Sequence, residues 1–184
     1  ITKRIPVGAG LGGGSSNAAV VLLGLNKLWD MGLSRDRLLG LAGKLGSDVA
    51  FFLYNTPFAE GLGKGDEIRE LKVLKNIRLW HLLAVPEIHV STPFVYKGWD
   101  KLMEVSKVHK RASLTRPVYN VKMLILALKK KNLFSIASEM HNSLQEVTVG
   151  FYPAVSRILG ALRKLGLEAI LMSGSGPAVF AIVS

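Results

Sequence analysis

The chain has 184 residues, of which 49% are hydrophobic and 20% are charged, so it can bury a core as one domain or as two small ones. It has no cysteine, which excludes a disulfide scaffold and a thiolate metal site, and its apolar runs are too short to span a bilayer. The net charge of +11 favours anionic ligands. Because the chain has no cysteine, we expect a protein of the cytoplasm, or of the plastid stroma in a plastid-bearing organism.

The start of the chain combines a glycine run with an apolar helix. Residues 1–6 predict the end of a strand, and five glycines follow within residues 8–14. Apolar residues at helical spacing then predict a helix over residues 15–31, with the hydroxyls of Ser15 and Ser16 as its caps. Such a junction binds anions, because free N–H groups and the helix dipole face the ligand and glycine lets it approach closely. A flexible linker is disfavoured because the run continues directly into the helix.

The next segment carries the strongest candidate for a catalytic side chain. Ser34 predicts the cap of a helix that ends at Gly46, and residues 47–53 predict a short apolar element. Asp48 lies in that element, where a carboxylate is expected to be hydrogen-bonded or functional because an isolated buried charge is costly. Two interpretations stay open: a catalytic carboxylate, or a cap for the short helix that follows.

The pattern then changes to strands. Residues 58–63 and 67–71 predict a hairpin around a turn at residues 63–66, and a further strand is expected over residues 77–85. Ser91 is followed by a threonine and a proline, which predicts the N-terminus of another helix.

A strongly basic stretch follows, with a predicted loop over residues 106–117. Between Lys97 and Lys131 there are ten basic residues and only two acidic ones, Asp100 and Glu104. The stretch is either a surface for anions, such as a nucleotide, a phosphorylated substrate or a nucleic acid, or a solvated face without a partner. The sequence leaves both interpretations open.

The last third of the chain predicts helices followed by two strands joined by a loop of small residues. The expected elements are helices over residues 121–130 and 133–138, a helix starting within 141–146, an amphipathic helix over 152–165, and strands over 167–172 and 178–183. The loop over residues 173–177 either closes over a phosphate or substrate, or is a plain hairpin turn. Paired helices and strand hairpins without regular alternation indicate an α+β fold.

Residues 6–19, PVGAGLGGGSSNAA, resemble the phosphate-binding motif of the GHMP small-molecule kinases. Further segments match the family in its own order along nearly the whole chain, and together they are far more specific than one glycine loop. These segments are residues 46–52, 59–63, 90–92 with Tyr96, 142–146 and 172–177.

The resemblance implies the GHMP kinase architecture. Residues 1–75 would be the remainder of an N-terminal ATP-binding domain that resembles a ribosomal-protein domain, and residues 76–184 a ferredoxin-like C-terminal substrate domain. The implied reaction is phosphoryl transfer from ATP, with Mg²⁺, to the 2-hydroxyl of a cytidyl diphospho-erythritol in isoprenoid biosynthesis. The implied partner is this small molecule, without nucleic acid or membrane, and the implied state is a monomer or homodimer.

The resemblance also assigns roles to residues. Asp48 would take the proton of the substrate hydroxyl, and Ser16 would contact Mg²⁺. The residues implied to bind ATP are Pro6, Val7, Gly8, Ala9, Gly10, Leu11, Gly12, Gly13, Gly14, Ser15 and Ser16. The residues implied to bind substrate are Thr92, Ser173, Gly174, Ser175 and Gly176.

The chain departs from the family at its beginning. It has no initiating Met and lacks the Pro-Ala-Lys-x-Asn segment whose lysine pairs with the catalytic aspartate in the family. We therefore expect a piece of a longer protein that alone is inactive or nearly so. The alternatives are another GHMP kinase, of the homoserine or mevalonate type, and a non-catalytic basic fragment that binds nucleic acid.

Overall fold

The computed structural model describes residues 2–63, 65, 67–108 and 120–183, which form parts of two compact units. The N-terminal unit is Gly12–Ile77, and the C-terminal unit is Ile1–Leu11 together with Arg78–Ser184. The expected division after residue 75 lies close to the break at Ile77. The first residues group with the C-terminal unit because the carbonyls of Ala9 and Gly10 accept hydrogen bonds from that unit.

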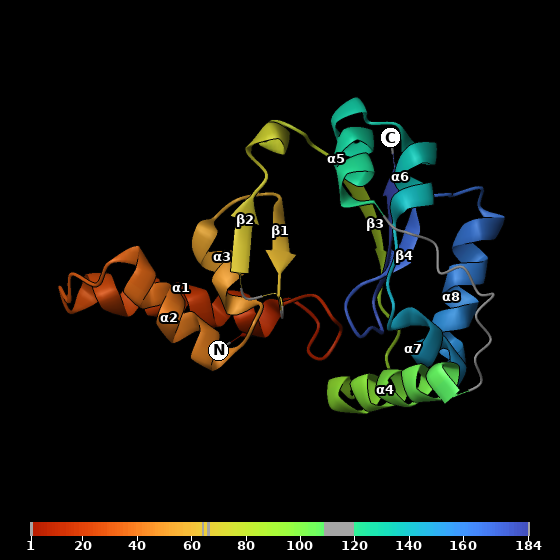
Figure 1. Cartoon of the computed structure of the whole chain (residues 1–184), viewed down its shortest axis with the longest axis horizontal. Helices are drawn as coiled ribbons and strands as arrows, with labels where there is room; N and C mark the ends of the chain where they lie inside the picture. The colour runs from red at the N-terminus through yellow and green to blue at the C-terminus, as the bar shows by residue number, and fades with distance from the viewer. Residues whose placement is uncertain (1, 64, 66, 109–119, 184) are drawn as a thin grey trace. The chain divides into compact units, whose positions relative to one another are not determined.

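The N-terminal unit packs three helices beside a small hairpin (Figure 1). Its elements are α1 (Gly13–Leu28), α2 (Arg35–Leu45), α3 (Val49–Tyr54), β1 (Ala59–Leu62), β2 (Glu67–Glu70) and the 3-10 helix η1 (Lys72–Leu74). The buried residues at the centre of the helices are Ala19, Leu38, Ala42, Val49, Ala50 and Leu53. Four of these six are alanine or valine, whose small side chains let the helices pack closely.

The two predicted helix starts in this unit have different outcomes. Ser34 caps α2 as predicted, since its side chain accepts a hydrogen bond from the backbone N–H of Arg37, and the helix ends before Gly46. The prediction that Ser15 and Ser16 cap α1 is wrong. The helix begins at Gly13, so both serines lie inside its first turn, where they cannot act as the N-cap.

The predicted hairpin is confirmed. β1 and β2 pair antiparallel from Ala59 opposite Glu70 to Leu62 opposite Glu67, while Lys64 and Asp66 of the expected turn lie outside the described residues.

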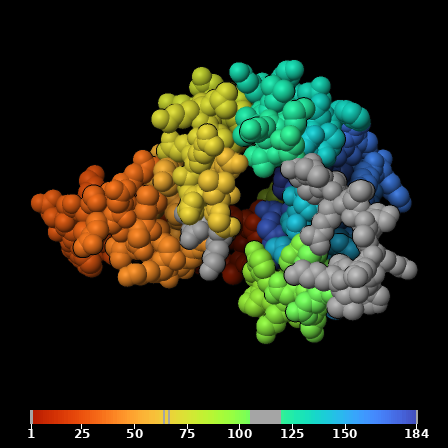
Figure 2. Space-filling model, in the orientation of Figure 1, coloured from red at the N-terminus to blue at the C-terminus, as the bar shows by residue number. Residues whose placement is uncertain are grey.

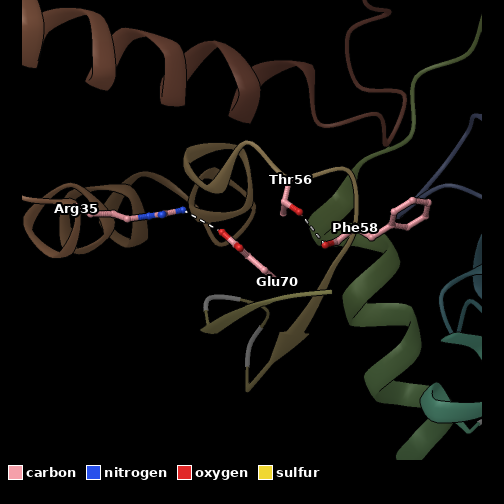
Figure 3. A network of polar contacts seen from close by, with 4 residues as sticks. All are labelled: Arg35, Thr56, Phe58 and Glu70. Atoms are coloured by element: carbon pink, nitrogen blue, oxygen red, sulfur yellow. Dashed lines mark hydrogen bonds and ion pairs between the residues drawn. The ribbon is translucent and has the colours of Figure 1, made fainter. Parts of the chain in front are cut away.

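A polar network ties the hairpin to the helices (Figure 3). The guanidinium of Arg35, on α2, lies 3.4 Å from a carboxylate oxygen of Glu70 on β2 and 4.2 Å from the ring centre of Tyr54 on α3. The hydroxyl of Thr56 donates a hydrogen bond to the carbonyl oxygen of Phe58, just before β1. One arginine on α2 therefore contacts both β2 and α3.

The C-terminal unit is built on an antiparallel sheet with the strand order β3-β5-β4 (Figure 1). Its elements are β3 (Trp80–Ala84), α4 (Thr92–Val108), α5 (Val121–Lys130), α6 (Leu133–Glu139), α7 (Gln145–Phe151), α8 (Pro153–Lys164), β4 (Ile170–Met172) and β5 (Val179–Val183). The predicted amphipathic helix is α8, which buries Val155, Leu159 and Leu162 against Met172 and Val179. The final strand pair is also confirmed, with Met172 opposite Val179.

Two other predictions in this unit, for residues 2–6 and for residues 106–117, differ from the structure. Residues 2–6 are irregular rather than the end of a strand, because a strand needs a paired neighbour and none lies beside them in the described chain. The first three residues of the expected loop over 106–117 belong to α4, which continues to Val108, and the remainder, 109–117, lies outside the described residues.

The described part of the basic stretch lies at the surface. α5 and α6 pack on each other, and their atoms form one continuous part of the surface in Figure 2. The lysines of this pair that are exposed are Lys122, Lys129, Lys130 and Lys131. None of the helices in the described ranges has the length and apolarity that crossing a membrane requires.

Candidate functional site

The glycine loop has the backbone geometry of an anion site. Gly8, Gly10 and Gly12 have φ angles of 67°, 73° and 65°, while the intervening Ala9 and Leu11 stay outside the left-handed region. Alternating backbone handedness turns successive N–H groups toward one side and forms an anion-binding nest. Only glycine adopts the left-handed conformation without strain, so this path explains the spacing of the glycines.

The first half of the loop is held by the C-terminal unit. The hydroxyl of Ser173 donates a 2.7 Å hydrogen bond to the carbonyl oxygen of Gly10, and the N–H of Ala178 donates a 3.2 Å bond to the carbonyl oxygen of Ala9. A Cβ atom on Gly10 would overlap the carbonyl oxygen of Ser173. The two loops of small residues therefore touch through their backbones, which requires glycine at this position.

The ring of His89, a residue to which the sequence assigns no role, lies beside the loop. A Cβ atom on Gly8 would be 2.9 Å from Nδ1 of the exposed His89. The imidazole therefore covers one side of the backbone at Gly8. No sequence signal could reveal this, because the two residues are 81 positions apart and meet only through the fold.

The second half of the loop opens α1 in the N-terminal unit. A Cβ atom on Gly12 would be 3.0 Å from the ring of Phe52 on α3, so α3 supports the start of α1. No side chain caps α1, and the hydroxyl of Ser16 donates back to the carbonyl of Gly13 at 3.0 Å. The first N–H groups of α1 have no helical acceptor and no cap, which leaves them to an anion at the positive end of the helix dipole.

Asp48 differs from the expectation of a carboxylate in an apolar setting. It precedes α3, and its side chain is exposed, since only the following Val49 and Ala50 are buried. The second interpretation is also not met, because its side chain makes no capping hydrogen bond. Its carboxylate accepts a 3.4 Å hydrogen bond from the hydroxyl of Ser47. The acidic group is therefore accessible to a ligand.

The predicted substrate loop, residues 173–177, is held mainly by its own unit. The hydroxyls of Thr92 and Ser175 lie 2.7 Å apart, and Thr148, fully buried, donates to the carbonyl oxygen of Ser175. Ser175 is itself 7% exposed. Thr92 and Ser175, expected at the substrate, therefore bond to each other and support the loop.

An open pocket of about 510 Å³ lies beside this loop, within the C-terminal unit. Of the residues expected to bind substrate, Ser173 and Gly174 line it, whereas Thr92, Ser175 and Gly176 do not. The other lining residues are Tyr96, Trp99, His141, Asn142, Ser143, Leu144, Leu171, Met172 and Phe180. Three aromatic rings and several hydrogen-bonding groups thus border one space, a composition typical of small-molecule sites.

Two residues organise the loop at the edge of this pocket. The side-chain amide of Asn142 donates to the carbonyl oxygens of Met172 and Gly174, and the side-chain oxygen of Gln145 accepts from the N–H of Met172 at 2.9 Å. Residues 142–146 belong to the segments that resemble the family, and the sequence predicts no role for them beyond the start of a helix. The signal was a run of amide and hydroxyl residues next to a helix N-terminus.

His141 lies at the same edge. Its Nε2 is 3.0 Å from the hydroxyl of Ser143, and burial lowers the pKa of the imidazole from its usual value of 6.5. No cluster of three or more histidine, aspartate or glutamate side chains suited to a metal ion occurs among the described residues.

Comparisons with known families match both ends of the chain. The N-terminal domain of the GHMP kinases matches residues 1–56, and the C-terminal domain of the GHMP kinases matches residues 124–184. Together these regions span more than half of the chain and lie in the order that the sequence predicted.

Two curated relatives share one name. A 4-diphosphocytidyl-2-C-methyl-D-erythritol kinase from Shouchella clausii is 43% identical over 183 residues, which is 100% of this chain and 57% of the relative. The protein of the same name from Geobacillus kaustophilus is 42% identical over 100% of this chain and 58% of the relative. The chain thus spans somewhat more than half the length of the curated relatives that it matches.

Solved structures agree on the fold. A crystal structure of a 4-(cytidine 5'-diphospho)-2C-methyl-D-erythritol kinase matches 99% of this chain and 60% of that chain, with a TM-score of 0.75 and 34% sequence identity. A homoserine kinase from Cytophaga hutchinsonii matches 99% of this chain and 58% of that chain, with a TM-score of 0.71 and 19% identity. The mixed helix and sheet architecture predicted from the sequence is confirmed.

Proposed function

Because the chain belongs to the GHMP kinase family, we propose that it is part of an ATP-dependent kinase that phosphorylates the 2-hydroxyl of 4-diphosphocytidyl-2-C-methyl-D-erythritol. The relatives at 42–43% identity and the structural match at 34% carry this name. The homoserine kinase, at 19% identity, supports the fold alone. The alternative within the family is a homoserine or mevalonate kinase.

The observation that carries the proposal is the glycine loop. Alternating left-handed glycines at Gly8, Gly10 and Gly12 lead into the uncapped N-terminus of α1. Backbone N–H groups and a helix dipole stabilise phosphate charge without any charged side chain. In our proposal the residues from Pro6 to Ser16 bind the phosphates of ATP.

Asp48 is the proposed general base. Phosphoryl transfer needs positioning and charge stabilisation more than covalent chemistry, and one carboxylate that accepts the hydroxyl proton completes it. The exposed carboxylate of Asp48, which accepts only one long hydrogen bond from Ser47 among the contacts described, can accept that proton.

Mg²⁺ is the proposed metal, with Ser16 as its candidate protein contact. When bound with ATP, the ion neutralises phosphate charge that develops during transfer. The hydroxyl of Ser16 donates a hydrogen bond to the carbonyl oxygen of Gly13, so the lone pairs of the hydroxyl oxygen are available to a cation.

The pocket beside residues 173–174 is the proposed site for the substrate. Tyr96, Trp99 and Phe180 line it, and aromatic rings of this kind stack on nucleobases such as a cytosine. The amide and hydroxyl groups at its edge can recognise the polar atoms of the base. A small-molecule partner therefore suits this unit.

A ligand comparison by thermal unfolding tests the proposal. ATP with Mg²⁺, and separately the cytidyl substrate, are expected to raise the unfolding temperature of the chain, because ligands that bind only the folded state stabilise it. Single-stranded RNA and duplex DNA are the matched polyanion controls. Stabilisation by the nucleic acids but not by ATP would overturn the kinase proposal and favour the basic nucleic-acid-binding alternative.

A transfer assay tests the role of Asp48. Phosphate transfer from ATP to the cytidyl substrate is measured for the chain and for its variants, with ordinary kinase turnover of about 1–100 s⁻¹ as the reference. Any residual transfer should disappear in Asp48→Asn and persist in Asp36→Asn, a control on the exposed first turn of α2. Equal residual transfer in both variants would exclude Asp48 as the base.

A further inference from the structure

The turn between β4 and β5 borders the pocket and also contacts the first half of the glycine loop. Ser173 and Gly174 line the pocket, while the hydroxyl of Ser173 holds the carbonyl of Gly10. The pocket and the first half of the glycine loop therefore share one structural element, and all of these residues belong to the C-terminal unit. A group that fixes the turn also fixes the backbone at Gly10.

Asn142 holds this turn at both ends. Its Nδ2 donates to the carbonyl oxygen of Met172 at 2.8 Å and to that of Gly174 at 2.7 Å. Its Oδ1 accepts from the N–H of Leu144 at 2.9 Å, which fixes the amide against α7. Both amide protons are thus used on the two carbonyls that flank Ser173.

We propose that Asn142 is a positioning residue for the phosphate loop, acting through the turn at Ser173 on the carbonyl of Gly10. This inference rests on the proposed function in one respect, which is the identity of the ligand that the loop binds. The held turn keeps the hydroxyl of Ser173 within 2.7 Å of Gly10, so the loop is ordered before the ligand arrives. Without Asn142 the ligand must order the loop during binding, which lowers its affinity.

Two variants separate the steps of this path. Asn142→Asp keeps the size of the side chain and the acceptor for Leu144, but places a carboxylate against two carbonyl oxygens. Ser173→Ala removes only the hydroxyl that reaches Gly10. Asn132→Asp is the matched control, because Asn132 caps α6 through its Oδ1 and a carboxylate caps equally well.

The first readout is the binding of inorganic tripolyphosphate, measured by calorimetry on the whole chain. Asn142→Asp and Ser173→Ala should each weaken binding on the order of tenfold, the equivalent of one or two hydrogen bonds. The double variant should bind tripolyphosphate no more weakly than the single variant with the lower affinity, because both substitutions act on the same path. Asn132→Asp should bind like the unaltered chain.

The second readout is amide hydrogen exchange at Ala178, whose N–H donates to the carbonyl of Ala9 in the glycine loop. Its exchange should accelerate in both variants, while the N–H of Ile182, bonded to Ala169 in the same sheet, keeps its rate. A general loss of structure would accelerate both amides. This comparison separates positioning of the loop from a merely structural role.

Additive losses of affinity, or an unchanged exchange rate of Ala178 in Asn142→Asp, would overturn the proposal. If Asn142→Asp does not fold, Ser173→Ala decides, and unchanged affinity and exchange in that variant overturn it as well. If the unaltered chain does not bind tripolyphosphate, the proposed phosphate site fails, while exchange at Ala178 still tests the link between Asn142 and the loop.

Discussion

The hydroxyl of Ser173 donates a 2.7 Å hydrogen bond to the carbonyl oxygen of Gly10, 163 residues earlier in the chain. The first half of the glycine loop and the loop between the last two strands are therefore one assembly within the C-terminal unit. A bond to the backbone fixes the direction of a peptide group, so Ser173 influences where the neighbouring N–H groups point.

Substitution of Gly10 should be severe. Gly10→Ala adds a Cβ that overlaps the carbonyl oxygen of Ser173 and strains a residue with φ of 73°. We expect destabilisation of about 2–4 kcal/mol from the clash and the strain together, with loss of tripolyphosphate binding. Urea unfolding and calorimetry measure the two effects.

Gly24→Ala is the control for that substitution. Gly24 is exposed within α1, and no atom beyond the adjoining residues and the neighbouring backbone of that helix would lie within 4 Å of its added Cβ. Because alanine is the better helix former, this variant should gain about 0.5–1 kcal/mol. Equal effects of the two substitutions would contradict the close approach of Gly10 to Ser173.

His141 should make stability depend on pH. Burial lowers its pKa in the folded protein below the usual 6.5, so the unfolded chain binds the proton more readily. Its contribution is therefore fully present above pH 6.5 and is lost as the pH falls from there through the lower folded pKa. Urea midpoints for the chain and for His141→Gln, compared at pH about 7.5 and about 5.5, isolate the contribution of His141 to stability. A histidine titration midpoint above 6.5 by NMR would contradict it.

Arg35 should stabilise the N-terminal unit through two weak contacts. Its side chain is 52% exposed, so the ion pair with Glu70 is screened, and the ring of Tyr54 supplies the remaining attraction. Arg35→Ala should cost about 1 kcal/mol in total. Arg37→Ala, at an exposed position two residues later in α2, should cost under about 0.5 kcal/mol. Urea unfolding in low and high salt compares them, and a loss that vanishes completely in high salt would exclude the ring contact.

Thr92 should act as a support and not as a ligand contact. Thr92→Val removes the partner of the buried Ser175 hydroxyl and should cost about 1 kcal/mol, whereas Thr92→Ser keeps the hydroxyl and most of the stability. Cytidine affinity, measured by calorimetry, should stay the same in both variants because Thr92 does not line the pocket. A selective loss of cytidine affinity in Thr92→Val would restore Thr92 as a substrate contact.

The sequence by itself determined the features that depend on neighbouring residues. The cap at Ser34, the hairpin, the amphipathic α8 and the final strand pair follow from periodicity and from local hydrogen bonds. The anion-binding character of the glycine loop is also local, since it depends on left-handed backbone and on a helix N-terminus.

Only the tertiary structure decided which distant groups meet and which are buried. Asp48 is exposed although its neighbours are apolar, because α3 turns Val49 and Ala50 into the core and leaves the preceding residue outside. Asn142 and Ser173 acquire their roles from carbonyl groups that are far from them in the sequence or that lie across a turn. Hydrogen bonds of this kind depend on where the backbone of another segment lies, and residue type and spacing do not encode that position locally.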